Sequence, residues 1–169
     1  MTHVPIFSAL FGLLLALPAA AQDVAFDGAI TEACLATDAP SESCIGLAAD
    51  ACMRDTEGGE STVGMGACLA AEAAYWDGRL NAAYDALRVR TRAVDAETQD
   101  YGVVAPSQAE ALQAMQRAWI PFRDAACDYE RSKWGGGTGQ GPASAACLLH
   151  QTAMRTLALE ADLTERQDR

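Results

Sequence analysis

The sequence predicts an all-α protein: a small helical bundle of about three main helices, preceded by a disulfide-rich helical segment. Three observations predict this class. The chain is rich in alanine, leucine, glutamate and arginine, which favour helices. Its apolar residues recur at steps of three and four, and extended alternation of β-branched residues is absent. Six cysteines in a short chain indicate disulfides.

The first 21 residues have the pattern of a secretory signal peptide. An apolar run over 7–17 is followed by Pro18 and three alanines that end at Ala21. Such a run is too short to cross a bilayer comfortably, and it ends in a typical cleavage site. We expect cleavage there, which leaves residues 22–169 as a single helical domain. The alternative is a leader that stays attached as an anchor. The residue directly after the cleavage site is Gln22 and not a cysteine, so we expect a periplasmic or secreted protein that is not a lipoprotein.

The N-terminal part is expected to hold two short helices, over about 28–37 and 42–54, with Pro40 between them and Ser41 opening the second. A polar, glycine-containing loop covers 55–61. A long helix follows over about 63–97. Its apolar stripe comprises Leu69, Ala73, Trp76, Leu80, Ala83, Tyr84 and Leu87.

The C-terminal part is expected to hold two further helices. Residues 100–106 break the long helix, and Ser107 with Glu110 forms a capping box that opens the next one, to about residue 130. Pro121 should kink that helix. A glycine-rich connector over 134–141 leads to a last helix over about 143–164, whose first turn suits Pro142. The apolar stripe of the first of these helices comprises Leu112, Met115, Trp119, Phe122 and Ala126.

Helix geometry limits how the cysteines can pair. Cys44 and Cys52 are eight residues apart on one expected helix, which separates their Cα atoms by about 12 Å. A disulfide tolerates only about 7 Å, so these two must pair elsewhere. An exchange of partners among the first four cysteines, such as Cys34 with Cys68, remains open. The favoured pairs each close a short loop between helices: Cys34 with Cys44, Cys52 with Cys68, and Cys127 with Cys147.

The charge is concentrated in the first half of the chain. The formal net charge is −11, and residues 22–77 hold eleven acidic residues and one basic residue, Arg54, a net −10. Such a balance disfavours nucleic acid and anionic membranes, and it favours basic partners. A simple role in solubility is the alternative. The loop with Asp55, Glu57 and Glu60 is the candidate partner-binding segment.

Catalytic chemistry has little support in the sequence. Beyond the leader the single histidine is His150, and no G-x-S-x-G, H-E-x-x-H or phosphate-binding loop is present. The acidic loop lacks the ligand spacing of a calcium-binding EF-hand. We expect no enzymatic activity, no cofactor and no metal site. Asn81, Arg123, Thr152 and Arg155 fall on expected packing faces, where we expect a hydrogen-bond network between helices.

Two linked motifs in the chain resemble a known family. The first is Cys68-x-x-x-Glu72-x-x-x-Trp76-Asp77-x-x-Leu80-Asn81-x-x-Tyr84, and the second is Trp119-x-x-Phe122-Arg123-Asp124-x-x-Cys127, followed by Cys147, Thr152 and Arg155. This pattern resembles the lysozyme inhibitor LprI-like family, and the likeness extends over about residues 44–163. The motif residues that we expect to support the fold are Glu72, Trp76, Asp77, Asn81, Tyr84, Trp119, Arg123, Asp124, Thr152 and Arg155.

The resemblance implies an exported, helical and disulfide-bonded bacterial protein, and it implies that some members inhibit lysozyme. We therefore expect a binding protein that inhibits lysozyme-type muramidases, with a basic lysozyme as its protein partner. We expect neither nucleic-acid binding nor membrane insertion. The alternative is a periplasmic structural or protein-interaction module without inhibitory activity.

Overall fold

The computed structural model describes residues 23–165, and within that range every regular element is a helix and there is no strand. The expected all-α class is confirmed. The expected signal peptide lies outside the described residues. The elements are α1 (Ala29–Leu35), the short 3-10 helix η1 (Ser41–Cys44), α2 (Leu47–Asp55), α3 (Thr62–Asp100), α4 (Gln108–Ser132) and α5 (Gln140–Glu165).

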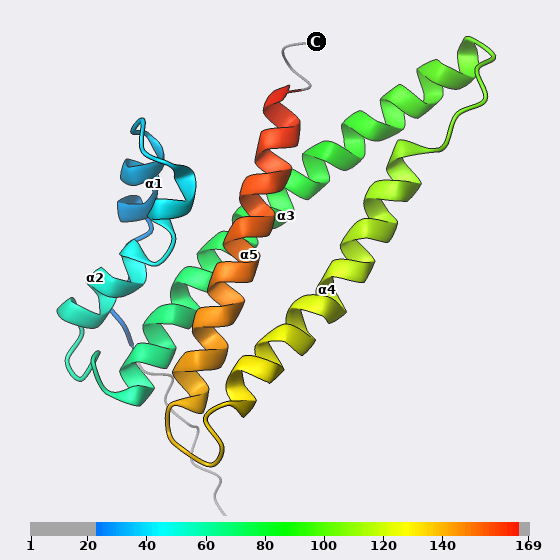
Figure 1. Ribbon diagram of the computed structural model, residues 1–169. Coiled ribbons are helices and arrows are strands. Elements are labelled where there is room, and N and C mark those ends of the chain that lie inside the picture. Colours follow the sequence, from blue (N-terminus) through cyan, green and yellow to red (C-terminus); the bar gives the residue numbers. More distant parts are fainter. Residues whose placement is uncertain (1–22, 166–169) are drawn as a thin grey trace, which may run out of the picture.

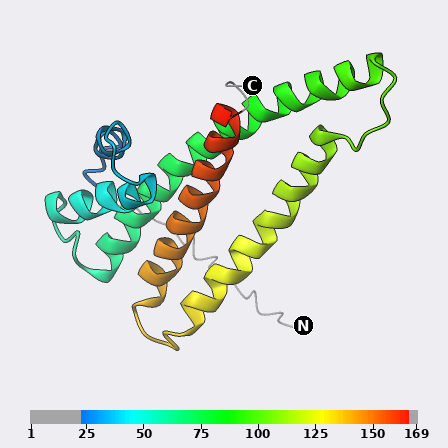
Figure 2. The ribbon, with the colours of Figure 1, turned by 45° about the horizontal axis from the view of Figure 1, so that its top comes forward.

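Helix α3 is the axis of the molecule. Its 39 residues give a length of about 58 Å. Helix α5 packs along α3 and also against α4, which returns from the far end of α3 (Figure 1). The short elements α1, η1 and α2 lie together near the other end of α3, and α4 lies at an edge of the bundle (Figure 2).

Two apolar clusters form the core, and α3 and α5 contribute to both. The first cluster joins the middle of α3 to α4 and α5 through Leu80, Ala83, Leu87, Leu112 and Leu159. The second joins α2, α3 and α5 through Ala49, Trp76, Leu149 and Ala153. The short N-terminal helices are thus fixed to the bundle by the same helices that form its centre.

Three disulfides close short segments between neighbouring elements, and no cysteine in the described range is free. The Cα atoms of the bonded residues are 5.3 to 5.7 Å apart. The pairs are the three favoured from the sequence: Cys34 with Cys44, Cys52 with Cys68, and Cys127 with Cys147.

The expected helix over 42–54 is wrong in one respect, because it is interrupted. Gly46 has a φ of 94°, which favours glycine, and it separates η1 from α2. Cys44 and Cys52 therefore lie on different elements, so the single-helix premise of the spacing argument does not hold. The interruption turns Cys44 toward Cys34, and it lets the start of α2 point at α3.

The expected apolar stripe of α4 is wrong in part. The residues of α4 that are buried are Leu112, Gln116 and Cys127, whereas Met115 and Phe122 are 43% and 62% exposed. Because α4 is covered on one side only, a broad apolar pattern exceeds the face that the bundle can bury. The helix continues through Pro121 as one element. Helix α5 begins at Gln140, so the glycine connector is shorter than expected.

Candidate functional site

The acidic lobe consists of residues 23–77, which form α1, η1, α2 and the first part of α3. Ten of its eleven carboxylate side chains are exposed to solvent, and Glu72 is buried. Like charges held on one end of the molecule produce a negative potential that extends into solvent. The exposed members are Asp23, Asp27, Glu32, Asp38, Glu42, Asp50, Asp55, Glu57, Glu60 and Asp77.

The turn between α2 and α3 presents the three carboxylates that the sequence singled out. Asp55, Glu57 and Glu60 are all exposed. The turn itself is tightly built: the hydroxyl of Ser61 donates to the carbonyl of Gly58 (2.6 Å) and accepts from the backbone N–H of Gly64 (3.1 Å). The disulfide between Cys52 and Cys68 joins the two helices that the turn connects. The charges are therefore presented from a constrained backbone.

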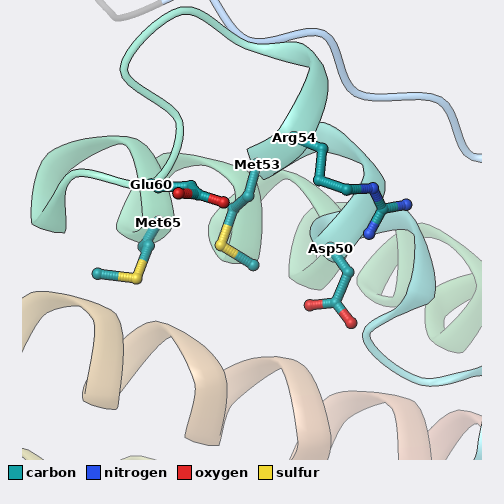
Figure 3. A pocket seen from close by; sticks show the side chains of 5 residues that line it. All are labelled: Asp50, Met53, Arg54, Glu60 and Met65. Atoms are coloured by element: carbon teal, nitrogen blue, oxygen red, sulfur yellow. The ribbon is translucent and has the colours of Figure 1, made fainter.

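A surface hollow of about 510 Å³ lies beside this turn. It is lined by Asp50, Met53 and Arg54 from α2, by Glu60 from the turn and by Met65 from α3 (Figure 3). Two carboxylates and the guanidinium of Arg54 leave a formal charge of −1 beside two thioethers. This lining can accept a side chain with an apolar stem and a cationic head, such as lysine or arginine, on the side of Glu60. The hollow thus provides carboxylates for the charged head and thioethers for the apolar stem of such a side chain.

Glu72 has a structural role that the sequence did not reveal in detail. Its carboxylate is buried and accepts hydrogen bonds from the backbone N–H groups of Gly46 (2.8 Å) and Ala49 (2.7 Å). It also accepts from the indole N–H of Trp76 (3.1 Å). A carboxylate at the amino end of α2 satisfies donors that the helix leaves free, and it interacts favourably with the helix dipole.

Asp95 plays the same part for α4, and sequence reasoning missed it. It accepts from the Ser107 hydroxyl (2.7 Å) and from the backbone N–H groups of Gln108 (2.8 Å) and Ala109 (3.0 Å). These hydrogen bonds hold the pKa of Asp95 below its ordinary value, and the bond from Ser107 has the largest effect. Ser107 also accepts from the N–H of Glu110, as its expected role at the helix start requires. Helix α3 therefore caps both α2 and α4.

A second cluster that sequence reasoning missed ties α1 to the bundle. Arg79 of α3 forms ion pairs with Glu32 of α1 (3.1 Å) and Glu160 of α5 (3.0 Å). The hydroxyl of Tyr75 donates a hydrogen bond to Glu32. The pKa of Tyr75 is raised, mainly by burial and then by this hydrogen bond. Burial acts to lower the pKa of Arg79, but hydrogen bonds to Glu160 and Tyr75 raise it above its ordinary value. The i, i+4 spacing of Tyr75 and Arg79 was the available signal.

The motif residues of the second half meet around Trp119. The guanidinium carbons of Arg123 and Arg155 lie 5.0 and 5.9 Å from its ring centroid. Arg155 of α5 donates to the Gln116 side chain of α4 (3.0 Å), and burial lowers the pKa of Arg155. Arg123 pairs with the neighbouring Asp124 (2.8 Å). The cluster therefore joins α4 to α5.

The remaining motif residues divide between core and surface. Thr152 is buried on α5, and Tyr84 packs against the first apolar cluster. The expectation that Asn81 faces the packing side is wrong: it is exposed and donates to Asp77, also exposed, at 3.1 Å. The stripe of α3 that faces its neighbours passes through Leu80 and Ala83 instead, which turns residue 81 outward.

Neither a metal-binding group nor a membrane-spanning helix is found among the described residues. His150 is exposed on α5. Among residues 23–165 no three histidine, cysteine, aspartate or glutamate side chains are grouped so that they could hold a metal ion. In the same range, no helix has the length and apolar character that a membrane crossing requires. The acidic lobe gives the described range a strongly charged surface.

Comparison with known proteins gives one family match and two relatives. Residues 52–159 match the family model described as lysozyme inhibitor LprI. An uncharacterised 17.7 kDa protein from the puhA 5′ region of Rhodobacter capsulatus is 30% identical over 155 residues, covering 88% of this chain and 93% of the relative. An uncharacterised protein of Rhizobium meliloti is 32% identical over 84 residues, covering 50% of this chain and 60% of that protein. No solved structure matches the chain.

Proposed function

This chain belongs to the LprI family of lysozyme inhibitors, and we propose that it is an exported protein that inhibits a lysozyme-type muramidase through its acidic lobe. The three disulfides fit an extracellular or periplasmic protein, where thiols are oxidised. The proposed cleavage after Ala21 would release the acidic chain on that side of the membrane. The observation that carries the proposal is the row of exposed carboxylates on the acidic lobe.

Charge complementarity supports a basic lysozyme as the partner. Lysozymes of the c type are strongly basic, and opposite charges on two surfaces accelerate encounter and favour one orientation. The Asp55–Glu60 turn would meet the basic surface first, because its carboxylates are exposed on a constrained backbone. A lysine or arginine of the partner would then enter the hollow between Asp50 and Glu60.

The substitutions Asp55→Asn, Glu57→Gln and Glu60→Gln together test the surface. These changes keep the side-chain size and remove three negative charges. We expect at least tenfold weaker inhibition in an assay that follows the clearing of a cell-wall suspension by a basic lysozyme. We also expect the wild-type inhibition to weaken as salt rises, because exposed charges are screened within about 10 Å at 0.1 M salt.

The matched control removes three exposed carboxylates at the opposite end of α3 and the adjoining start of α4: Glu97→Gln, Asp100→Asn and Glu110→Gln. Residues 60 and 97 are about 55 Å apart at the rise of a helix. We expect inhibition within about twofold of wild type, since that distance exceeds the screening length. Equal inhibition by both triple variants would exclude the turn as the binding site. No inhibition at micromolar wild-type protein would exclude the activity and favour a protein-interaction module.

A further inference from the structure

The connector between α4 and α5 presents a tryptophan to solvent. Trp134 is 56% exposed, although tryptophan is a large apolar residue that folding usually covers. The other two tryptophans, Trp76 and Trp119, each have an arginine guanidinium over the ring, 5.4 and 5.0 Å from its centroid. In the described part of the chain no arginine or lysine lies over Trp134.

The backbone of the connector holds the Trp134 ring in place. A Cβ atom at Gly139 would lie 2.5 Å from Cζ3 and 2.8 Å from Cδ2 of the indole, so the ring lies face-on against this glycine. The N–H of Gly137 donates to the carbonyl of Trp134 (3.0 Å), and the side-chain amide of Gln140 donates to the carbonyl of Gly135. One face of the indole is therefore covered by backbone, and the ring is fixed with the rest exposed.

A surface hollow of about 440 Å³ lies between the end of α4 and the first turns of α5. Trp134 follows Glu130 by four residues, and the Ala143 N–H donates to the carbonyl of Gly139 (3.0 Å), one turn before it. The indole therefore stands at the end of the hollow. The hollow is lined by small side chains and by three polar ones: Ala143, Ala146, Cys147, Glu130, His150 and Gln151.

The walls of the hollow are held together covalently. Cys147 lines it and is bonded to Cys127 of α4, so the disulfide fixes α5 against α4 at this point. A preformed site spares a ligand the cost of ordering the protein. The volume also falls within the range of about 300–1,000 Å³ that small-molecule sites occupy.

We propose that this hollow, together with Trp134, binds a pyranose saccharide. A pyranose ring carries apolar C–H groups on its faces and hydroxyl groups around its edge. Its C–H face stacks on the exposed side of the indole, an amphipathic ring suited to a wet surface. Its hydroxyl groups then point toward the polar side chains of the hollow.

The polar side chains suit hydroxyl groups better than they suit an ion. Lys133 donates to Oε1 of Glu130 (2.6 Å), which leaves Oε2 of the same carboxylate to accept from a hydroxyl. The imidazole of His150 and the amide of Gln151 each offer a donor and an acceptor. A hydroxyl group both donates and accepts, so a mixed set of this kind matches it, whereas a cation would need acceptors alone.

Isothermal titration calorimetry of residues 22–169 with two neutral trisaccharides, chitotriose and cellotriose, tests the proposal. We expect saturable binding of at least one of them, with a dissociation constant between about 0.1 and 5 mM, as a few contacts in an open hollow provide. Chitotriose carries acetamido groups where cellotriose has hydroxyls, so the tighter ligand identifies the group that the site selects. Because both sugars are uncharged, binding should be unchanged by salt.

The substitution Trp134→Ala should weaken binding at least fivefold, and it should abolish the change in tryptophan emission that the sugar causes in the wild type. His150→Ala should weaken binding about threefold through the loss of a hydrogen bond. Tyr101→Ala is the matched control, since Tyr101 is an aromatic residue 77% exposed at the far end of α3. It should leave the dissociation constant within about twofold.

All three substituted side chains are exposed, so each variant should keep the wild-type circular dichroism. The absence of binding of both sugars at about 10 mM would overturn the proposal. Equal binding by Trp134→Ala and Tyr101→Ala would overturn it as well. The measurement contains no muramidase, so its result is independent of the inhibition proposed for the acidic lobe.

Discussion

At the scale of single residues, the most informative side chain is Glu72. A buried carboxylate usually suggests chemistry, yet the three donors around this one belong to Gly46, Ala49 and Trp76. Its acceptor sites are occupied by the fold itself. The spacing of Glu72 and Trp76 on one helical face could be predicted from the sequence. The amino end of α2 could not, because it lies far away in the chain and arrives only when α2 packs on α3.

We expect Glu72→Gln to destabilise the protein by about 2–4 kcal/mol. The amide keeps the size of the side chain but turns one acceptor into a donor that faces backbone N–H groups, and it removes a charged partner from a buried site. Urea unfolding followed by circular dichroism measures the loss. The exposed Glu57→Gln should change stability by less than about 0.5 kcal/mol. Equal midpoints for the two variants would contradict the capping role.

Arg79 shows a second limit of reasoning from single positions. Its partners Glu32 and Glu160 lie on α1 and α5, so neither is a near neighbour in sequence. The local pattern places Arg79 one turn after Tyr75, but it does not identify the two carboxylates that pair with Arg79. The joint that ties α1 to the bundle therefore became visible only with the tertiary structure.

At the scale of elements, the long helices follow their sequence patterns closely. Ser61 and Ser107 cap α3 and α4, and the breaks after each helix fall at glycine-containing segments. The N-terminal elements were harder to predict. Gly46 interrupts a segment that the sequence pattern predicts as one helix, and the approach of α2 to α3 accounts for the interruption.

The contact between α3 and the turn before it depends on the absence of a side chain at Gly64. A Cβ atom there would lie 2.2 Å from the carbonyl oxygen of Gly58 and 2.5 Å from the Cα of Gly59. We expect Gly64→Ala to destabilise the protein by about 1–3 kcal/mol, because backbone atoms must move apart.

Gly78 lies on an exposed part of the same helix, and a Cβ atom there meets nothing within 4 Å. We expect Gly78→Ala to stabilise the protein by about 0.5–1 kcal/mol, through the higher helix propensity of alanine. Thermal unfolding of both variants measures the two opposite shifts. A higher unfolding temperature for Gly64→Ala would show that helix propensity outweighs the close contact there.

At the scale of the whole molecule, charge and apolar surface are separated. The acidic lobe lies near one end of α3, whereas the exposed apolar side chains of Met115 and Phe122 belong to α4, the edge helix of the bundle (Figure 2). Substitutions on the acidic lobe therefore leave the apolar surface of α4 unchanged, so their effects report on charge alone.

The disulfides join neighbouring elements, α1 to η1, α2 to α3, and α4 to α5. Removing the bond between Cys127 and Cys147, which are 20 residues apart, should cost about 3 kcal/mol in the chain-entropy model. The double variant Cys127→Ala, Cys147→Ala tests this by urea unfolding. Peptide mapping of the unreduced wild type should recover these two cysteines linked. A wild-type midpoint in the double variant would contradict a stabilising role.

The sequence by itself determined the helical class, the approximate ends of the long helices, the favoured cysteine pairs and the concentration of acidic charge. Each of these depends on composition or on residues close together in the chain. The tertiary structure alone decided which side of α4 is buried, which carboxylates cap α2 and α4, and how Arg79 joins three helices. These depend on which elements approach one another, and that is set by burial of apolar surface over the whole molecule, which leaves Phe122 outside and Glu72 inside.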